Sequence, residues 1–405
     1  MSNFAFGTYR ISEHNPQHIE ALREAINSGI RLIDTSSNYM DGSAERAIAI
    51  AMREFDDNIK NEIEIVSKVG YIQGSNMEKH KKTPFDNVVE YSEECFHSIS
   101  PTFIETQLTD SLKRLELKKI NCYLLHNPEY YLYDAINKNI GKDERLDEIY
   151  NRIYKAFIQL EKEVKNKRIE SYGISSNSFS IPSSNDEFLP YEDLVTLAEK
   201  ASKEVENTKH NFTTIELPIN ILEKNGLHCA SWAKENNLRV LANRPLNANY
   251  NNVMYRLAQY DESVEYYNYL NELLNVSDNK TLKSLYNLIE QLDDSKHKFA
   301  WIGDYDTFLY SQIVPHIKKT LENIDEENRE TLFNFIDLFL QEYRKMVAYE
   351  CGEKTKETLK SFFKNSINPL QETALKYLAD NEDIDYVLVG MRKSSYVNQI
   401  LSLDK

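Results

Sequence analysis

Short apolar runs recur along the chain at intervals that helices could fill. They lie at residues 4–9, 30–34, 62–68, 120–126, 169–175, 213–218, 238–243 and 384–390. Between them are segments whose apolar residues return every three or four positions, which is the spacing of an amphipathic helix. The pattern therefore predicts eight strands that alternate with helices.

Two of the intervening segments carry clear signals for the start of a helix. Ser100 precedes Pro101, and Asn15 precedes Pro16. Serine and asparagine cap a first turn through their side-chain oxygens, and proline suits the first helical position. Gly29 follows the second of these segments and can end it in a left-handed conformation. Both segments are predicted to be helices.

Eight repeats of strand and helix predict a parallel sheet closed into a (β/α)8 barrel. An open, doubly wound sheet is the alternative. That fold usually has a glycine-rich phosphate-binding turn after its first strand. This chain has FGTYRIS there, and it contains only 11 glycines in 405 residues. The barrel is therefore the preferred interpretation.

One segment breaks the alternation. Residues 249–365 separate the seventh and eighth predicted strands, where a helix and its loops would need far fewer residues. The pattern in this segment is helical, as in RETLFNFIDLFLQEYRKMVAYE at 329–350. We expect a barrel over 1–248 plus 366–405 and a helical insertion over 249–365 that packs on the barrel near its mouth. A separate partner-binding subdomain is the alternative interpretation of the insertion.

Composition narrows the class of protein. The net charge of −16 argues against a nucleic-acid surface. No apolar stretch is long enough to span a membrane, and the start MSNFAFGTYR lacks the pattern of a secretory signal. The four cysteines are scattered, without the spacing of a metal or redox motif. We therefore expect a cytoplasmic globular protein with no nucleic-acid, membrane or metal partner.

Titratable residues follow three consecutive apolar runs. Asp34 ends the second run, Lys68 the third and His126 the fourth, and Tyr39 lies five residues after Asp34. Each of them alone has an ordinary explanation, since the chain holds 26 tyrosines and charged residues often end strands. The carboxyl ends of barrel strands converge on one mouth, however. The occurrence of these four residues at the ends of three consecutive predicted strands therefore favours one shared site.

These four residue types suit proton transfer to a carbonyl. A free phenol, with a pKa of about 10, is too weak an acid to protonate an alkoxide readily at neutral pH, and a neighbouring ammonium lowers that pKa. Asp34 would keep Lys68 charged, and His126 would orient a carbonyl oxygen. The accompanying hydride must come from a cofactor, because no side chain supplies one.

Five stretches, in the family's order, resemble the aldo-keto reductases. GIRLIDTSSNYMDGSAE (29–45) is similar to the family signature around its aspartate and catalytic tyrosine. The others are IETQLTDSLKRLELKKINCYLLHNPE (104–129), SYGISSNSF (171–179), VLANRPLNA (240–248) and INPLQETALKYLADNEDIDYVLVGMRKSSYVNQIL (367–401). The likeness covers nearly the whole chain apart from the insertion.

The resemblance implies a role for each matching residue. Tyr39 would be the general acid/base, Lys68 the partner that lowers its pKa, Asp34 the partner of Lys68, and His126 the group that orients the substrate. The family binds NADPH across the barrel mouth, so the implied cofactor is NADP(H), with NAD(H) as the alternative. The implied cofactor-binding residues are Gly7, Thr8, Tyr9, Asp34, Ser175, Ser176, Asn177, Glu216, Asn243, Arg244, Pro245, Leu246, Gly390, Arg392, Lys393 and Gln399.

Several of these positions depart from the family pattern. Glu216 stands where the family usually has glutamine, and a carboxylate can accept but not donate a hydrogen bond. Asn243 and Arg244 stand where many members have an aromatic residue that stacks on the nicotinamide. Arg392 and Lys393 could bind a 2′-phosphate, which would favour NADPH, because guanidinium suits phosphate geometry. A solvated charge pair at a helix start is the alternative.

The implied function is NADPH-dependent reduction of an aldehyde or ketone to an alcohol, or the reverse. A cofactor-binding regulatory or redox-sensing protein with little turnover is the alternative. The substrate would be a small carbonyl compound or alcohol. A wall supplied by the aromatic residues of 249–365 is compatible with a sugar or another polyol.

Overall fold

The computed structural model describes residues 3–251, 253–275, 283–299, 301–322, 326–362 and 368–404. The chain divides into two compact units, Met1–Pro245 with Lys376–Lys405, and Leu246–Leu375. The predicted boundary between residues 365 and 366 lies outside the described residues. The packing of a helical insertion on the barrel stays a prediction.

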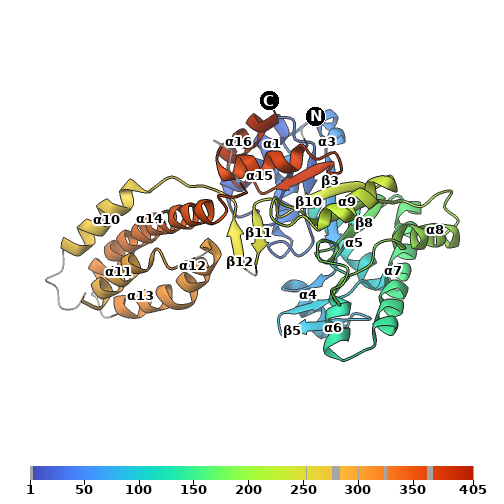
Figure 1. Ribbon diagram of the computed structural model, residues 1–405, viewed down its shortest axis with the longest axis horizontal. Coiled ribbons are helices and arrows are strands. Elements are labelled where there is room, and N and C mark those ends of the chain that lie inside the picture. The colour runs from blue at the N-terminus through green and yellow to red at the C-terminus, as the bar shows by residue number, and fades with distance from the viewer. Residues whose placement is uncertain are drawn as a thin grey trace. The chain divides into compact units, whose positions relative to one another are not determined.

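The first unit is a closed parallel barrel (Figure 1). Its strands are β1 (Phe4–Gly7), β2 (Leu32–Asp34), β3 (Glu64–Val69), β7 (Ile120–His126), β8 (Ile169–Ser175), β9 (Phe212–Pro218), β10 (Arg239–Asn243) and β13 (Tyr386–Val389). They are hydrogen-bonded in the order β1-β13-β10-β9-β8-β7-β3-β2, and β2 pairs with β1 to close the ring. Each of the eight apolar runs forms one strand. The (β/α)8 prediction is therefore confirmed, and the open sheet is excluded.

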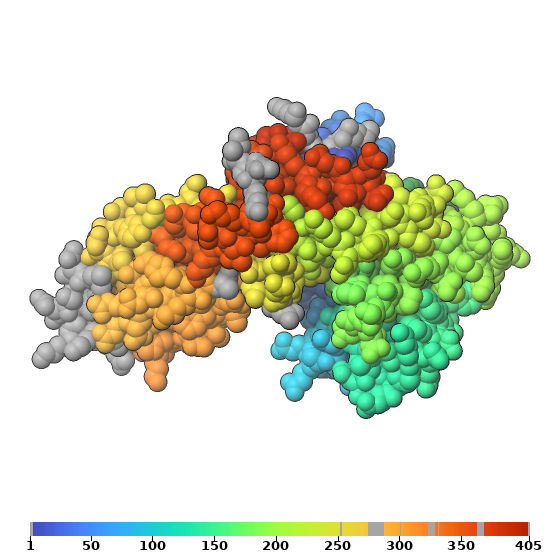
Figure 2. Space-filling model, in the orientation of Figure 1, coloured from blue at the N-terminus to red at the C-terminus, as the bar shows by residue number. Residues whose placement is uncertain are grey.

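Helices surround this barrel. They are α1 (Pro16–Asn27), α2 (Ser43–Met52), α3 (Asp57–Glu62), α4 (Ser75–Lys82), α5 (Pro101–Leu115), α6 (Tyr130–Asn137), α7 (Lys142–Lys165), α8 (Leu194–Glu204), α9 (Gly226–Glu235), α15 (Leu370–Ala379) and α16 (Ser394–Leu401), with 3-10 turns at Ser178–Ser180 and Ser402–Asp404. Figures 1 and 2 show α7 and α8 side by side on the outside of the barrel. The α15 helix begins in the second unit and ends in the first.

The predicted helix starts are confirmed. The Ser100 side chain accepts a hydrogen bond from the backbone N–H of Phe103 and caps α5. The Asn15 side chain accepts from the N–H of Gln17 and caps α1. Gly29 follows α1 with φ +96°, a left-handed conformation that glycine adopts without steric cost.

The barrel interior continues directly into its mouth. Alternate residues of a strand face the same side, so the residue two positions after an interior side chain also faces inward. The interior cluster contains residues of several strands, and in four of these strands a polar residue lies two positions after a member of the cluster. The pairs are Leu32 and Asp34, Val66 and Lys68, Leu124 and His126, and Leu241 and Asn243. The same strands thus carry the core and the candidate chemistry.

A small antiparallel sheet between β3 and β7 was not predicted. It consists of β4 (Tyr71–Ile72), β5 (Val89–Ser92) and β6 (Cys95–His97), in the order β4-β6-β5. Glu93 and Glu94 connect β5 to β6. That pair lacks the glycine or asparagine that usually marks a tight hairpin turn, so the sequence carried no strong turn signal here.

The second unit combines a hairpin with a group of helices. Its elements are β11 (Asn247–Tyr250), β12 (Val253–Arg256), α10 (Val264–Asn275), α11 (Lys283–Ser295), α12 (Ile302–Phe308), a π-helical turn at Leu309–Ile313, α13 (Val314–Leu321) and α14 (Glu326–Thr358). The hairpin at its start, where β11 and β12 pair antiparallel, was not predicted from the sequence. Asn251, which follows β11, has φ +52°, a conformation that asparagine tolerates better than most residues.

The second unit has its own core, and tyrosines fill much of it. Tyr266, Tyr305 and Tyr343 are fully buried in one cluster with Phe339. The Tyr343 hydroxyl donates to the Leu292 carbonyl oxygen at 2.6 Å. Aromatic residues that the sequence offered as a substrate wall thus serve, at these positions, as packing.

Among the described residues, no helix is both long and apolar enough to cross a membrane. The four cysteines are free thiols, as their scattered spacing indicated. Cys122, Cys229 and Cys351 are buried, and Cys95 is half-buried. Burial raises the pKa of Cys122 and Cys229, which keeps both thiols protonated.

Gly173 tests the close packing of the barrel wall. A methyl group at this position of β8 would clash with the Thr214 carbonyl oxygen of β9 and lie 2.8 Å from the Leu124 side chain. We expect Gly173→Ala to lower the free energy of unfolding by about 3 kcal/mol, because the obstacle is backbone. Gly141→Ala is the matched control, since nothing lies within 4 Å of its added methyl group. Equal denaturation midpoints for the two variants would contradict the close approach of β8 and β9 at Gly173.

Candidate active site

The centre of the site is the buried ammonium group of Lys68 on β3. Its Nζ atom donates to an Asp34 carboxylate oxygen on β2 and to the Thr35 carbonyl oxygen at 3.0 Å. Glu216 on β9 brings Oε2 to 3.2 Å from the same Nζ. All three charged side chains are at most 5% exposed. The site thus holds two carboxylates against one ammonium.

This imbalance of charge changes the pKa of both partners in the Asp34–Lys68 pair. Burial raises the pKa of Asp34, and Glu216 adds to the rise, against the opposing effect of Lys68. Burial opposes charge on Lys68, but Asp34 and Glu216 outweigh it and raise the pKa of Lys68 above its ordinary value. Lys68 is therefore a permanent ammonium ion at neutral pH.

Tyr39 lies beside this ion pair. The Ser37 N–H donates to the Lys68 carbonyl oxygen at 3.3 Å, which holds the loop after β2 against β3. The Tyr39 ring centre is 5.3 Å from Lys68 Nζ. Burial raises the pKa of Tyr39, and Asp34 and Glu216 add to this, while Lys68 opposes it. Lys68 thus lowers the Tyr39 pKa as expected, but burial outweighs its effect, with Asp34 and Glu216 adding to the rise, so that the net change is upward.

His126 completes the group and has a defined proton position. Its ring lies 6.0 Å from the Tyr39 ring, and its Nδ1 lies 3.1 Å from the Ser36 hydroxyl oxygen. Ser36 donates its one proton to Asn38 Oδ1 at 2.7 Å. Nδ1 must therefore be the donor to Ser36, which leaves Nε2 as an acceptor. Burial lowers the pKa of His126, and Lys68 and His97 add to this, so the imidazole is neutral.

The loops around the mouth are held in a sparsely populated conformation. Met40, Asp41, Asn127 and Arg244 have φ between +51° and +54°. For residues other than glycine this costs about 1 kcal/mol each. Asp41 is held in place by Ser75, whose backbone N–H and hydroxyl both donate to its Oδ1, at 3.1 and 2.7 Å. Such strain is concentrated at functional sites in proteins generally.

Aromatic residues beside His126 were missed by sequence reasoning. The Tyr71 ring on β4 lies 4.8 Å from the His126 ring, edge to face, and the Tyr71 hydroxyl accepts from Asn127 Nδ2 at 2.6 Å. His97 on β6 donates from Nε2 to the His126 carbonyl oxygen at 2.7 Å. Burial lowers the pKa of His97 to about 4, so it is neutral. These residues belong to the unpredicted small sheet, so no sequence signal connected them with His126.

The predicted residues after β1 adjoin the centre. The Thr8 hydroxyl donates to the Asp34 carbonyl oxygen at 2.8 Å, so it ties β1 to β2. The Tyr9 side chain is 65% exposed, and its ring lies 5.2 Å from the Tyr39 ring. Gly7 lies beside Gly390 of the β13 end, where a methyl group on Gly390 would stand 3.9 Å from the Gly7 carbonyl oxygen.

The turn after β8 is organised by a buried carboxylate. Glu129 accepts from the Ser176 hydroxyl at 2.8 Å, from the Asn177 N–H at 2.9 Å and from the Ser178 N–H at 3.4 Å. The Ser176 hydroxyl is therefore committed to the protein. Ser175 is buried at the end of β8, and Asn177 is half-buried.

Two buried acceptors at the mouth fit a donor from outside the protein. Asn243 Nδ2 donates to Glu216 Oε1 at 2.9 Å. Among the described residues, Asn243 Oδ1 has no hydrogen-bond donor, and Glu216 Oε2 has only the Lys68 ammonium, 3.2 Å away. Buried polar atoms are usually paired, and an amide NH2 such as that of a nicotinamide carboxamide is a donor of the right kind.

Of the remaining predicted cofactor residues, Arg244 follows the carboxyl end of β10, and Arg392 and Lys393 follow the carboxyl end of β13. Arg244, Arg392 and Lys393 are exposed cations. Burial lowers the pKa of His18 on α1, and the charge of Arg392 adds to this effect. Lys393 precedes α16, and its Nζ lies 6.0 Å from the Tyr396 ring. Pro245 is buried in the first unit, Leu246 belongs to the second unit, and Gln399 is half-buried on α16.

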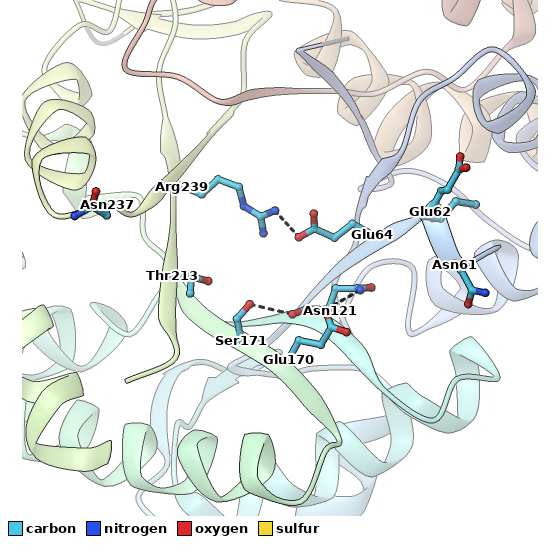
Figure 3. A pocket seen from close by; sticks show the side chains of 10 residues that line it. Asn61, Glu62, Glu64, Asn121, Glu170, Ser171, Thr213, Asn237 and Arg239 are labelled. Atoms are coloured by element: carbon cyan, nitrogen blue, oxygen red, sulfur yellow. Dashed lines mark hydrogen bonds and ion pairs between the residues drawn. The ribbon is translucent and has the colours of Figure 1, made fainter. Parts of the chain in front are cut away.

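A separate pocket of about 520 Å³ opens at the other end of the barrel (Figure 3). Its walls come from the amino ends of β3, β7, β8, β9 and β10. Arg239 and Glu64 form an ion pair across it, and the Ser171 hydroxyl donates to the Asn121 carbonyl oxygen at 3.0 Å. Barrel enzymes have their active sites at the carboxyl ends of the strands. This pocket lies at the amino ends, so the Tyr39 site remains the candidate active site.

Glu129 makes the stability of the turn after β8 depend on pH. Burial raises the pKa of Glu129 to about 7, against the opposing hydrogen bonds from Ser176, Asn177 and Ser178. The folded state therefore keeps a proton that the unfolded state releases near its ordinary pKa of about 4.3. Stability then falls as pH rises through this window and levels off above the folded-state pKa. The decrease is at most about 4 kcal/mol.

We expect the melting temperature of the wild-type protein to fall between pH 5 and pH 8. In Glu129→Gln the amide oxygen still accepts from a backbone N–H but does not titrate, so its melting temperature is expected to change less over the same range. Thermal unfolding at several pH values measures this difference. Parallel curves for the two proteins would contradict the assignment.

Comparisons with known proteins identify the family of this chain. The family model described as "Aldo/keto reductase family" matches residues 3–249. The fold is similar to a glycerol dehydrogenase from Gluconobacter oxydans, with 16% identity and a TM-score of 0.51 over 100% of this chain and 87% of that chain. An aldo/keto reductase from Klebsiella pneumoniae, solved with NADP and acetate, has 14% identity and a TM-score of 0.47 with the same coverage. No curated protein sequence matches the chain. Because the family model covers more than half of the residues, this chain belongs to the aldo/keto reductase family, a family of oxidoreductases.

Proposed function

We propose that this protein reduces an aldehyde or ketone to an alcohol with NADPH, or catalyses the reverse reaction, with Tyr39 as the general acid/base. The observation that carries the proposal is the contact of the Lys68 ammonium with Asp34 and its position 5.3 Å from the Tyr39 ring centre. A buried ammonium beside a phenol favours the charge that develops on the phenol oxygen when it gives up a proton.

Tyr39 supplies the proton in the direction of reduction. Its raised pKa keeps the phenol protonated at neutral pH, which suits a donor to a carbonyl oxygen. As the phenol transfers this proton, Lys68 stabilises the resulting phenolate, and Asp34 holds Lys68 in place. In the direction of oxidation, the same phenolate takes the proton of the alcohol.

His126 serves as an acceptor in this scheme. Its Nδ1 proton is directed to Ser36, so Nε2 offers a lone pair and not a proton. Nε2 can therefore accept from the hydroxyl of an alcohol but cannot donate to a carbonyl. The donor to the carbonyl oxygen is then Tyr39 alone, and the contribution of His126 is to orient the alcohol.

A nicotinamide cofactor, when bound, would supply or accept the hydride at the substrate carbon. Its carboxamide would be received by Asn243 Oδ1, which has no donor among the described residues, and by Glu216 Oε2, which contacts only the Lys68 ammonium. The exposed cations Arg244, Arg392 and Lys393 would bind its phosphates. The preference for NADPH rests on Arg392 and Lys393, because a guanidinium and an ammonium match a 2′-phosphate.

A second candidate function is that of a cofactor-binding redox sensor with little turnover. The observation that favours it is Glu216, whose charge opposes formation of the Tyr39 phenolate. Saturable binding of NADPH without turnover on a broad panel of aldehydes and ketones would support the sensor. Turnover of any of them supports the reductase.

Replacement of Tyr39 by phenylalanine separates chemistry from binding. We expect Tyr39→Phe to lower kcat at least about 100-fold, because the general acid is removed. The Kd of NADPH should change less than about twofold. Tyr154→Phe on α7 is the matched control, since the Tyr154 hydroxyl contacts Glu204 on the outer helices. Unchanged turnover in Tyr39→Phe would exclude Tyr39 as the acid.

Replacement of Ser36 tests the proton position on His126. Ser36→Ala removes the acceptor of the Nδ1 proton, so the imidazole loses its fixed tautomer, and kcat should fall about tenfold. Ser36→Thr keeps the hydroxyl and should keep most of the activity. Ser37→Ala, one residue away, is the control for loss of a buried hydroxyl. Equal kcat values for Ser36→Ala and Ser37→Ala would contradict the proposed tautomer.

A further inference from the structure

We propose that Glu216 makes this site prefer the oxidised, cationic form of the nicotinamide cofactor over the reduced, neutral form. The proposal rests on the proposed function, since it requires that a nicotinamide binds at this mouth. The Lys68 ammonium is in contact with Asp34 and also with Glu216, whose Oε2 lies 3.2 Å away.

The ionisable groups that face Lys68 set the charge of the site. They are Asp34 from β2, Tyr39 from the following loop, His126 from β7 and Glu216 from β9. Tyr39 and His126 are neutral at neutral pH. One ammonium therefore faces two carboxylates, and the site carries one excess negative charge when both are ionised.

Nothing inside the described part of the site compensates this charge. Asn243 donates one amide N–H to Glu216 Oε1 at 2.9 Å, and an amide is neutral. Glu216 Oε2 has only the shared ammonium as a partner among the described residues. A buried carboxylate that shares its ammonium partner with a second carboxylate keeps uncompensated negative charge. It therefore favours the binding of a further positive charge.

The nicotinamide ring is the positive charge that the chemistry brings. Its hydride-transferring carbon must reach the substrate carbon whose oxygen exchanges a proton with Tyr39, and reacting atoms lie about 3 to 3.5 Å apart. Tyr39 and Glu216 flank the same Lys68 Nζ. With its carboxamide at Asn243 and Glu216, as proposed above, the ring would lie within about 10 Å of the Glu216 carboxylate. At that distance, and with an effective dielectric constant of about 20, one charge changes a binding constant by about tenfold.

The preference also depends on pH. At low pH Asp34 takes up a proton, the excess charge disappears and the two cofactor forms should bind alike. As pH rises and Asp34 ionises, the Kd of the oxidised form should fall relative to the Kd of the reduced form. Burial and the charge of Glu216 raise the pKa of Asp34. The loss of its proton, and with it the change in the charge of the site, therefore occurs closer to neutral pH than for an ordinary carboxyl group.

The test is the ratio of the Kd of NADP+ to the Kd of NADPH, measured by titration calorimetry on the full chain. The two ligands share their phosphates and adenosine, so these contributions cancel in the ratio. We expect Glu216→Gln to raise the ratio about tenfold by weakening NADP+ alone. Glu216→Asp, which keeps the charge, should return the ratio toward the wild-type value.

Glu170→Gln is the matched control. Glu170 is an exposed carboxylate near the amino end of β8, at the opposite end of the barrel, so its loss should leave the ratio unchanged. An equal effect of Glu170→Gln and Glu216→Gln would overturn the proposal. So would a ratio that does not change in Glu216→Gln.

Two further outcomes are informative. If the wild-type protein binds neither NADP+ nor NADPH, the proposed function itself fails. If Glu216→Gln does not fold, the test is the ratio of the Kd of NADP+ to the Kd of NADPH for the wild-type protein, measured between pH 6 and pH 9. A ratio that falls as pH rises supports the role of Glu216, and a ratio that stays constant overturns it.

Discussion

The buried ammonium of Lys68 is the interaction on which the rest of the site depends. Removing an ammonium from water is costly unless carboxylates and carbonyl oxygens replace the lost hydration. Asp34, Glu216 and the Thr35 carbonyl oxygen do so here. Because Lys68, Asp34 and Glu216 come from three strands, β3, β2 and β9, and β9 does not neighbour β3, the full set of contacts forms only when the barrel is closed. The charge that acts on Tyr39 is therefore a product of the whole fold.

Most of the fold could be predicted from the sequence because the barrel repeats one simple pattern. Each apolar run becomes a strand, and the residue two positions after an interior side chain reaches the mouth. Asp34, Lys68 and His126 could be placed together on that basis alone. The helix caps at Asn15 and Ser100 were equally readable, since capping needs only local geometry.

The features that escaped prediction depend on contacts between distant residues. The net direction of the Tyr39 pKa follows from burial and from Glu216, which lies 177 positions later in the chain. The tyrosine and histidine beside His126 come from a small sheet without a clear turn signal. The hairpin at 247–256 interrupts a segment whose overall period is helical. Sequence periodicity reports neighbours along one element, and it carries little information on such long-range pairs.

The order of the strands has a consequence for biosynthesis. The strand between β1 and β10 is β13, so Phe4 pairs with Val387 and Leu241 with Tyr386. A ribosome that has made the first seven barrel strands must still translate the whole of Leu246–Leu375 before the last strand emerges. Until then, β1 and β10 expose unpaired backbone edges, which are templates for association with other chains. Nascent chains of this protein should therefore depend on chaperones that bind open sheet edges during this interval.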